Sequence, residues 1–295
     1  MTLVLLTGAT RGIGRAAAVE ISRQGVEVAL VGRDPARVRA VAREASQAGG
    51  GAPVHEHVAD LTLMTEVRAL ATEVRQRYGR IDVLANNAGA LFASRGESAE
   101  GLERTLALNH LAPFLLTNLL RDRLRGARVI TTASDAHQSG LLNLEDLQSE
   151  RSYSAMGVYG TSKLCNILFT RELAKRAPEL RANCFHPGVV RTGFGKGENG
   201  IWKVLTTLGA PFFRSPRHGA RSLLWLALSD DAADLSGEYV QDEKVRSPSA
   251  QAQDEMLAEE LWQRSAELVG LSGRGGRREA GMPQERRDRG GPGRV

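Results

Sequence analysis

A glycine-rich turn that directly follows the first apolar run constrains the fold of this chain more than any other feature. Leu3–Leu6 is short and apolar, as a buried strand is, and the turn Thr7-Gly-Ala-Thr-Arg-Gly-Ile-Gly14 separates it from the amphipathic stretch Arg15–Gln24. Glycines at such a turn let the backbone approach a pyrophosphate closely, and the free N–H groups and dipole of the next helix attract its negative charge. A turn that only starts a helix is the alternative, but strand, glycines and helix in this order predict a dinucleotide site.

The same alternation continues along most of the chain. Further apolar runs at Val28–Val31, Ile81–Ala85 and Val129–Thr132 are expected to be buried strands. The stretches Thr62–Tyr78 and Ala107–Arg125 have the pattern of helices. Alternating strands and helices form parallel βαβ units whose right-handed crossovers place helices on both faces of one sheet. We therefore expect an α/β fold, a single Rossmann-type, doubly wound parallel sheet with helices on both faces.

Glycines after helical stretches and the composition of the chain define the predicted domain. Gly25, Gly79 and Gly126 each follow a helical stretch, where a left-handed C-terminal residue is favoured. No segment before residue 271 has the composition of a linker, so we expect one domain over residues 1–271. Residues 272–295 are rich in glycine and arginine and nearly free of aromatic residues, and we expect them to form a disordered tail.

Most of the positive charge of the chain lies in that tail. The whole chain carries a formal charge of +5, and residues 272–295 hold seven arginines against three carboxylates, a net +4, which leaves +1 for the remainder. A nearly neutral body argues against a nucleic-acid-binding protein. A solubilising tail is the favoured interpretation, and contact with RNA or an acidic partner is the alternative.

Other sequence features bear on location and metal binding. The apolar run Leu111–Leu120 contains Pro113 and Asn118 and is too short to span a bilayer. The chain starts without a basic segment of the kind that precedes a signal sequence, so we expect a cytoplasmic protein with no membrane span. Cys165 and Cys184 lie in apolar contexts and are expected to be buried free thiols, and no set of residues has the spacing of metal ligands.

The end of the second predicted strand bears on the choice of cofactor. An enzyme that uses NAD normally places a carboxylate there to bind the ribose 2′-hydroxyl. This chain has Gly32 followed by Arg33, and a second guanidinium, Arg11, lies in the glycine-rich turn. Two guanidinium groups suit the 2′-phosphate of NADP, which they can bind in bidentate fashion. Asp34 could reach the hydroxyl instead, but it precedes Pro35 and is expected to cap the next helix, so the sequence favours NADP(H).

Tyr159 and Lys163 are the most specific candidates for catalysis. Residues four apart on a helix share a face, so the phenol and the ammonium point the same way. The ordinary pKa of tyrosine, ~10, is too high for a base at neutral pH, and the ammonium is expected to lower it toward the useful range. An incidental surface pair is the alternative. Ser134 ends a predicted strand, where the carboxyl ends of parallel strands open onto a ligand crevice, and its hydroxyl could bind a carbonyl oxygen.

Four motifs together resemble those of the short-chain dehydrogenase/reductase family. They are the Thr-Gly-x3-Gly-x-Gly turn over residues 7–14, Asn86-Asn-Ala-Gly89, Tyr159-x3-Lys163 and Pro187-Gly-x3-Thr192. The resemblance covers residues 3 to about 271 and is nearest to the retinol-dehydrogenase-like branch. That nearer resemblance lies in Ser134-Asp-Ala-His137, in the segments 109–118 and 159–173, and in the segment 186–192.

The resemblance implies roles for individual residues. Ser134 and Tyr159 would bind the carbonyl oxygen, and Tyr159 would pass the proton. Lys163 would hold the nicotinamide ribose, and Asn109 would hold a proton-relay water behind the lysine. His110, beside Asn109, is expected to be structural. The implied cofactor-binding residues are Gly8, Thr10, Arg11, Gly12, Ile13, Gly14, Arg33, Asp60, Leu61, Asn87, Ala88, Gly89, Tyr159, Lys163, Pro187, Gly188, Val190 and Thr192.

The resemblance also guides the expected activity and partners. It implies an oxidoreductase that interconverts an alcohol and a carbonyl, and a homodimer formed by paired helices. The insert between Ser134 and Tyr159 and the segment Gly193–Arg214 would frame the substrate. The apolar residues of that segment predict a lipophilic substrate, although packing on the core or on a partner subunit explains them equally well; they are Ile201, Trp202, Val204, Leu205, Leu208, Phe212 and Phe213. The alternative function is a catalytically silent nucleotide-binding regulator.

Overall fold

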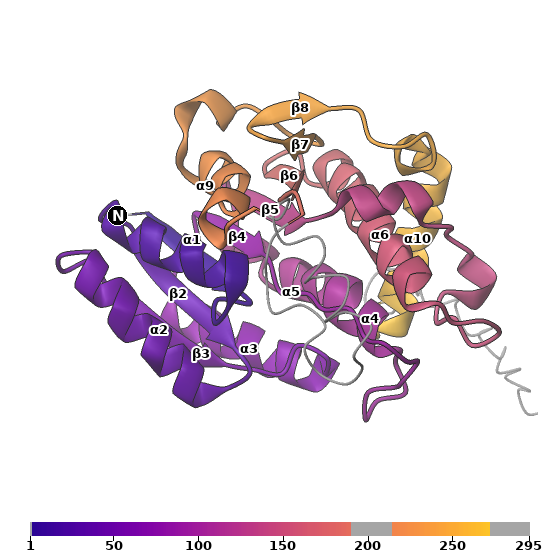
Figure 1. Ribbon diagram of the computed structural model, residues 1–295, viewed down its shortest axis with the longest axis horizontal. Coiled ribbons are helices and arrows are strands. Elements are labelled where there is room, and N and C mark those ends of the chain that lie inside the picture. The colour runs from indigo at the N-terminus through magenta and orange to yellow at the C-terminus, as the bar shows by residue number, and fades with distance from the viewer. Residues whose placement is uncertain (1, 190–213, 272–295) are drawn as a thin grey trace, which may run out of the picture.

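One sheet organises the molecule, and a computed structural model describes residues 2–189 and 214–271 of it (Figure 1). Within these ranges the strand order is β3-β2-β1-β4-β5-β6-β7-β8. Strands β1 to β7 are parallel, and β8 pairs with β7 in the antiparallel sense. The strands are β1 (Leu3–Thr7), β2 (Glu27–Gly32), β3 (Val54–Val58), β4 (Val83–Asn86), β5 (Arg128–Thr132), β6 (Arg181–His186), β7 (Tyr239–Gln241) and β8 (Lys244–Arg246).

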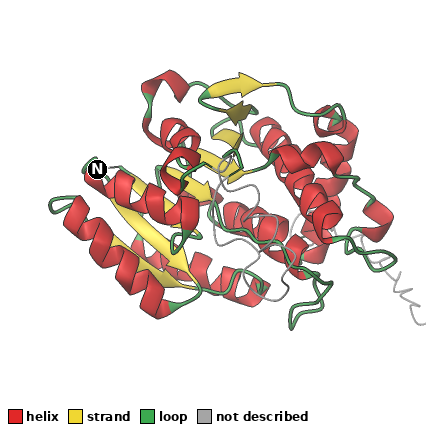
Figure 2. Cartoon of the chain, in the orientation of Figure 1, coloured by secondary structure: helices red, strands yellow, loops and turns green. Residues whose placement is uncertain are grey.

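Helices cover both faces of this sheet (Figure 2). Helices α1, α2 and α9 pack on one face, and α3, α5 and α6 pack on the other. The described helices are α1 (Gly12–Arg23), α2 (Pro35–Ala48), α3 (Met64–Arg77), α4 (Arg104–Leu106), α5 (Ala112–Leu119), α6 (Ala155–Arg176), α8 (Pro216–Gly219), α9 (Arg221–Leu228) and α10 (Glu255–Leu268). The predicted doubly wound fold is confirmed. Its strand order reverses direction between β1 and β4, which is where such sheets bind ligands.

Burial on both faces explains the continuous apolar runs of the sequence. In β1, Val4 and Leu6 pack with α1 and α2, while Leu3 and Leu5 face α3 and α5. All five residues of this strand are buried. A strand covered by helices on both faces has no solvent side, so its sequence shows no alternation of polar and apolar residues.

The predicted helix Ala107–Arg125 is wrong at its start and at its end. The structure has a short α4, then a π-helical turn over Ala107–Leu111, then α5, which ends at Leu119. Pro113 has no N–H to donate to the carbonyl of Asn109, so the regular ladder cannot pass this point and the turn widens. The remaining expected elements are present with small shifts; the largest is at α1, which begins at Gly12 rather than Arg15.

The glycine predictions hold at two positions and fail at the third. Gly25 and Gly126 have φ values of 75° and 73°, as expected for a left-handed helix end. Gly79 does not have a positive φ. Helix α3 instead ends at Arg77, and the backbone of the next residue, Tyr78, is extended at φ −122° and ψ 128°. The buried ring of Tyr78, bonded to His57, holds this residue in the core, so the chain leaves the helix before reaching Gly79.

Helix α6 is enclosed by its own chain. Every residue from Ser162 to Thr170 is buried, and α10 packs along the helix. Trp262 of α10 contacts the rings of Phe114 and Phe169 at 4.9 and 5.9 Å between centroids. Cys165 of α6 and Cys184 of β6 are buried free thiols, as predicted. Over residues 2–189 and 214–271, the helices are all too short or too polar to cross a bilayer.

Candidate active site

The glycine-rich turn leaves the start of α1 open. Gly8 and Gly12 have φ values of 66° and 51°, a conformation that side chains disfavour. A Cβ on Gly14 would lie 2.2 Å from the carbonyl oxygen of Gly8, so only glycine fits. No side chain caps α1, and its first turn holds no acidic residue. The first N–H groups of this helix therefore point to a crevice that suits an anion such as a pyrophosphate.

The end of β2 presents positive charge and excludes a carboxylate. A Cβ on Gly32 would lie 2.4 Å from Cγ2 of Thr10, so Thr10 takes the space that an acidic residue would need. Arg11 is exposed, and the side chain of Arg33 is 72% exposed with a long contact of 3.5 Å to Asp60. Such an exposed pair contributes little, so the Arg33 guanidinium remains free to bind another anion.

Asp34 and Asp60 both face local partners. Asp34 accepts hydrogen bonds from the backbone N–H groups of Ala36 and Arg37 at the start of α2, so its predicted capping role is confirmed. Asp60 accepts from Thr62 at 2.8 Å in addition to its contact with Arg33. The side chain of Leu61 is buried in the core, so it packs within the protein rather than facing the crevice.

The end of β4 is fastened to the glycine-rich turn. The hydroxyl of Thr7 accepts the backbone N–H groups of Asn87 and Ala88 at 2.9 and 3.1 Å. The Asn87 side chain donates to the carbonyl oxygen of Thr7 at 3.0 Å. A Cβ on Gly89 would lie 3.2 Å from Asn109 Oδ1 and 3.4 Å from Lys163 Nζ. This glycine therefore lets the end of β4 approach the two predicted catalytic side chains closely.

Helix α6 carries Tyr159 and Lys163 on one face, as predicted. The Lys163 Nζ lies 5.5 Å from the centroid of the Tyr159 ring and donates to the carbonyl oxygen of Thr132 at 3.0 Å. A side-chain hydrogen bond joins Tyr159 to Ser134. Gly160 permits this arrangement, because a Cβ there would lie 2.6 Å from the carbonyl oxygen of Ala136. The chain after Ser134 thus packs directly against α6, one residue from Tyr159.

The pKa of Tyr159 shifts in the direction opposite to the sequence prediction. Burial raises it to about 12, and the hydrogen bond with Ser134 offsets this only in part. Burial also lowers the pKa of Lys163 to about 8. The Lys163 ammonium faces the Tyr159 ring and the Thr132 carbonyl. Loss of water around the phenol and the ammonium outweighs the attraction between the ammonium and a phenolate. Tyr159 therefore keeps its proton at neutral pH, and Lys163 is still charged there.

Asn109 lies within the π-helical turn and is fully buried. Its Nδ2 donates to the Ala90 carbonyl at 2.9 Å and to Ser162 at 3.0 Å, while its Oδ1 accepts from the Ala90 N–H at 2.9 Å. Ser162 donates in turn to the Tyr159 carbonyl at 2.7 Å. The side chain thus joins the segment after β4 to α6. Pro113 has no N–H to donate to the backbone carbonyl of Asn109, and the relay water predicted at Asn109 stays a prediction.

The loop after β6 brings Pro187 and Gly188 to the same edge of the sheet. Gly188 has a φ of 78° and lies against Arg214, whose guanidinium binds Asp242 in the β7–β8 turn. Val190 and Thr192, predicted to meet the cofactor, lie outside the described residues. So do the apolar positions between 201 and 213 and the tail over residues 272–295.

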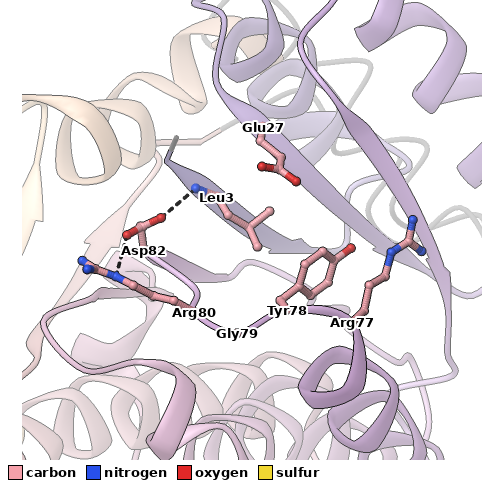
Figure 3. Close-up of a pocket in the computed structure, with 7 residues that line it drawn as sticks. All are labelled: Leu3, Glu27, Arg77, Tyr78, Gly79, Arg80 and Asp82. Carbon is pink, nitrogen blue, oxygen red and sulfur yellow. Dashed lines mark hydrogen bonds and ion pairs between the residues drawn. The ribbon is translucent and has the colours of Figure 1, made fainter.

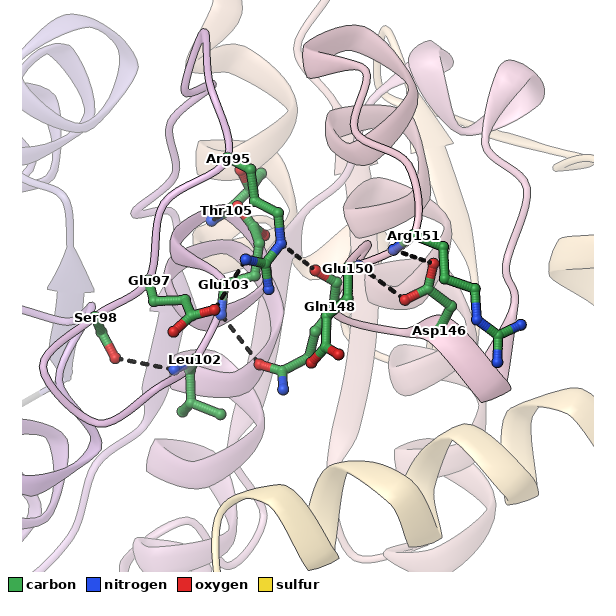
Figure 4. Close-up of polar contacts among 10 residues, drawn as sticks. All are labelled: Arg95, Glu97, Ser98, Leu102, Glu103, Thr105, Asp146, Gln148, Glu150 and Arg151. Carbon is green, nitrogen blue, oxygen red and sulfur yellow. Dashed lines mark hydrogen bonds and ion pairs between the residues drawn. The ribbon is translucent and has the colours of Figure 1, made fainter.

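Two segments on the substrate side are tied together by polar contacts (Figure 4). Arg95 donates to the carbonyl oxygen of Gln148 at 3.2 Å, and the Gln148 side chain accepts the Glu103 N–H at 3.1 Å. Tyr153 donates to the Phe92 carbonyl at 2.8 Å. The insert before Tyr159 is therefore held against the segment between β4 and α4, as a frame for a substrate requires.

Sequence reasoning missed several groups that build this site. Four of them are polar groups that hold a strand end or a helix face in place, namely Thr7, the Thr132 carbonyl, Ser162 and Asn166. The fifth, Gly160, lets the chain after Ser134 approach α6 closely. Asn166 donates to the same Thr132 carbonyl as Lys163, at 3.1 Å. A polar residue one turn after Lys163 on a buried helix is the signal that could have indicated it.

A separate cavity lies at the opposite end of the sheet (Figure 3). It has a volume of about 420 Å³ and is lined by residues at the amino ends of the strands, namely Leu3, Glu27, Arg77, Tyr78, Gly79, Arg80 and Asp82. Asp82 binds the Leu3 N–H at 2.9 Å and Arg80 at 2.9 Å. Ligands of doubly wound sheets bind at the carboxyl ends, so this cavity is not the candidate active site.

Comparison with known proteins finds a matching family and similar proteins that cover most of the chain. The family described as short chain dehydrogenase matches residues 2–200. A candidate daunorubicin C-13 ketoreductase from Streptomyces sp. (strain C5) is 46% identical over 274 residues, covering 92% of this chain and 93% of its own length. Retinol dehydrogenase 14 of Mus musculus is 39% identical over 293 residues, covering 91% of this chain and 86% of its own length.

Solved structures share the fold and bind either nicotinamide cofactor. An uncharacterised protein from Mycobacterium paratuberculosis has a TM-score of 0.75 and 31% identity, covering 92% of this chain and 94% of its own. An alcohol dehydrogenase from Thermococcus sibiricus, complexed with 5-hydroxy-NADP, has a TM-score of 0.63 and 25% identity, covering 81% and 95%. An NADH-dependent reductase of alginate metabolism, complexed with NAD, has a TM-score of 0.61 and 25% identity, covering 81% and 93%.

Proposed function

The chain belongs to the short-chain dehydrogenase family, in its retinol-dehydrogenase-like branch, and from that premise we propose that it is an NADP(H)-dependent oxidoreductase that interconverts a lipophilic alcohol and its carbonyl. Tyr159 is the general acid and base in this proposal. Ser134 and Tyr159 bind the carbonyl oxygen, and Lys163 holds the nicotinamide ribose.

The chemistry divides between the cofactor and the chain. A bound reduced nicotinamide supplies a hydride, with its electron pair, to the carbonyl carbon. The Tyr159 hydroxyl gives its proton to the carbonyl oxygen as the C=O π bond breaks, which leaves an alcohol and a phenolate. Lys163, charged below pH 8 because its pKa is about 8, offsets the phenolate charge, and solvent returns the proton. Oxidation of the alcohol follows the same steps in reverse.

One observation carries this proposal: Ser134, Tyr159 and Lys163 meet at the carboxyl end of β5. Tyr159 is bonded to Ser134, and Lys163 lies under the ring while bonded to Thr132. A hydroxyl, a partly buried phenol and a buried ammonium together give a carbonyl oxygen two hydrogen-bond donors and a proton source. A silent nucleotide-binding protein, the alternative, needs none of these buried groups, and burying an ammonium costs stability.

Preference for NADP over NAD is supported by the end of β2. Arg11 and Arg33 are exposed beside the open start of α1, and Thr10 leaves no room for a carboxylate at Gly32. Family membership alone is compatible with either cofactor. Two guanidinium groups without a carboxylate in that position favour a 2′-phosphate.

A lipophilic substrate is supported by exposed apolar side chains beside the site. Leu141 follows the turn after Ser134, Met156 lies one turn before Tyr159, and Val189 follows Gly188; they are 82%, 46% and 61% exposed. The similar proteins include retinol dehydrogenases and a candidate daunorubicin C-13 ketoreductase, whose names indicate retinol and daunorubicin as their substrates. A cytoplasmic location stays a prediction.

The helix-paired homodimer also stays a prediction, and the packing of α10 bears on it. Helix α10 lies against α6, and Trp262 contacts Phe114 of α5 and Phe169 of α6. A dimer formed through these faces of α5 and α6 would first have to displace α10.

The proposed function is tested by following absorbance of the reduced cofactor with a panel of carbonyls. The panel contains aliphatic aldehydes, retinoid aldehydes and polycyclic ketones, each offered with NADPH and with NADH. We expect turnover of apolar carbonyls with NADPH and slower turnover with NADH. Tight binding of NADPH without turnover of any carbonyl would instead support the silent alternative.

A further inference from the structure

The peptide group between Ser134 and Asp135 is held on both sides by histidine rings. The Ser134 carbonyl oxygen lies 2.7 Å from His137 Nδ1, and the Asp135 N–H donates to His186 Nδ1 at 3.2 Å. A trans peptide is planar, so its C=O and N–H point in opposite directions. Two rings bonded to these two groups therefore fix the plane of the peptide that carries Ser134.

Each ring has a further partner that sets its tautomer. His137 Nε2 accepts the backbone N–H of Ser249 at 3.1 Å, so the proton of this ring is on Nδ1, facing Ser134. His186 Nδ1 is an acceptor, so its proton is on Nε2, which lies 3.2 Å from Asp135 Oδ2. A neutral imidazole has one donor and one acceptor, and the two rings therefore carry opposite tautomers. The rings are 1% and 5% exposed.

A tyrosine completes the arrangement. Tyr239, 4% exposed, donates to Asp135 Oδ1 at 2.7 Å, and its ring packs edge-on against His137 at 5.2 Å between centroids. His186 ends β6 and Tyr239 begins β7, while Asp135 follows β5. Three neighbouring strands thus contribute to holding one peptide group, and His186 directly precedes the Pro187–Gly188 turn.

The hydroxyl of Ser134 needs such support, because its own local bond is weak. Its Oγ accepts the Ala136 N–H at 3.2 Å, a short-range turn contact that many serines make. A group that binds a reacting oxygen has to be held within about 0.5 Å of its productive position. We propose that His137 and His186, with Asp135 and Tyr239, are positioning residues that fix Ser134 for its contact with the carbonyl oxygen. The inference rests on the proposed function in assigning that contact to Ser134.

The alternative is that these residues only stabilise the ends of β5, β6 and β7. A double-mutant cycle separates the two, because positioning acts through Ser134 and stability does not. We expect His137→Leu to lower kcat about tenfold in the wild-type background, and less than about twofold in a Ser134→Ala background. An equal loss in both backgrounds would overturn the proposal.

Conservative and remote variants serve as controls. His137→Asn keeps a donor near the Nδ1 position, and we expect it to recover most of the kcat lost in His137→Leu. His57→Leu removes an equally buried histidine, 1% exposed, on the edge strand β3, and kcat should stay within about twofold while thermal stability falls. Should His137→Leu fail to fold, Tyr239→Phe in the same cycle replaces it.

A second measurement does not depend on activity. Nitrogen chemical shifts of the two imidazole rings at neutral pH should show the proton on Nδ1 in His137 and on Nε2 in His186. Matching tautomers, or a charged ring, would contradict the proposed arrangement. If the wild-type protein turns over no carbonyl, the proposed function is refuted, and the chemical shifts alone test the arrangement of the rings. If the wild type is active and His137→Leu has the same kcat, only the positioning role is refuted.

Discussion

Two tyrosines at opposite ends of the same sheet have the same shift in pKa and different surroundings. Burial raises the pKa of both Tyr159 and Tyr78 to about 12. Tyr159 is bonded to Ser134, and a buried ammonium lies under its ring. Tyr78 is hydrogen-bonded to His57 at 2.9 Å; the guanidinium of Arg77 lowers its pKa, and the carboxylates of Glu27 and Glu73 raise it.

The difference shows what distinguishes a catalytic phenol from a structural one. A phenol that passes a proton needs a group that stabilises the phenolate. Tyr159 has the buried ammonium of Lys163 under its ring, whereas the cation beside Tyr78 is the exposed guanidinium of Arg77, which Glu27 and Glu73 oppose. The negative groups around Tyr78 disfavour a phenolate, so its hydroxyl serves as a fixed hydrogen-bond partner. A raised pKa therefore does not mark an active site unless the neighbouring charges suit the reaction.

Among the changes that test this comparison, Lys163→Met is expected to have the largest effect on turnover. Turnover should fall by about a thousandfold, because the phenolate loses its counter-charge. Stability at neutral pH should rise by about 3 kcal/mol, because burial lowers the pKa of Lys163 from 10.5 to about 8 and the folded state is penalised for holding the proton. Kinetics and denaturant unfolding measure both. Lys175→Met, which replaces a lysine with a 58% exposed side chain, is the control, and a fall in stability of Lys163→Met would contradict this account.

Paired glycine substitutions at the two ends of the sheet give the next largest effect. A Cβ on Gly14 would lie 2.2 Å from the Gly8 carbonyl oxygen, so Gly14→Ala should distort the turn and weaken NADPH binding by about a hundredfold. A Cβ on Gly79 meets no atom within 4 Å, so Gly79→Ala should leave binding unchanged. Cofactor fluorescence titration measures both. Similar losses in the two variants would mean that the crevice does not lie at the carboxyl end.

The pH dependence of carbonyl reduction should report Lys163 rather than Tyr159. The raised pKa keeps Tyr159 protonated across the neutral range, whereas Lys163 loses its charge above its pKa of about 8. The rate should be level below about pH 8 and fall by up to about tenfold per pH unit above it. Initial rates at saturating substrate over this range test the prediction. A rate that keeps rising well above pH 8 would show that the neutral amine is the active form.

The smallest effect is expected from Arg33→Ala. The side chain is 72% exposed, so solvent screens its charge, and the affinity for NADPH should fall by only about fivefold. The affinity for NADH should change by less than about twofold, because NADH lacks the 2′-phosphate. Arg80→Ala, at the opposite end of the sheet, is the matched control and should affect neither cofactor. Equal losses for the two cofactors would remove Arg33 from the proposed phosphate site.

Much of the fold follows from patterns that burial imposes. Strands covered on both faces must be apolar throughout, so runs such as Leu3–Leu6 indicate β1 directly. A turn between strand and helix that approaches a ligand closely requires residues without side chains, so its glycines indicate the turn. The apolar pattern does not predict the break in the helix around Asn109, because it continues across the break. Pro113 is the residue that indicates the break. The left-handed conformation predicted for Gly79 is wrong because the buried ring of Tyr78 determines where α3 ends.

The candidate site was predictable where one motif carries the geometry. Tyr159 and Lys163 share a helix, so their spacing places them together. His137 lies three residues after Ser134, but His186 comes from a distant part of the chain, and no local pattern places the two rings on the two sides of one peptide group. The pKa of Tyr159 was misjudged for the same reason, because desolvation depends on everything packed around the ring.

The most direct test of the central claim compares Tyr159→Phe with Tyr78→Phe. Each variant removes one buried phenol hydroxyl with the same raised pKa, one at each end of the sheet. NADPH binding and carbonyl-dependent NADPH oxidation are measured on the same samples of both variants and of the wild type. We expect Tyr159→Phe to bind NADPH normally and lose turnover by at least about a thousandfold, while Tyr78→Phe keeps both. Turnover by Tyr159→Phe at the wild-type rate would contradict the account.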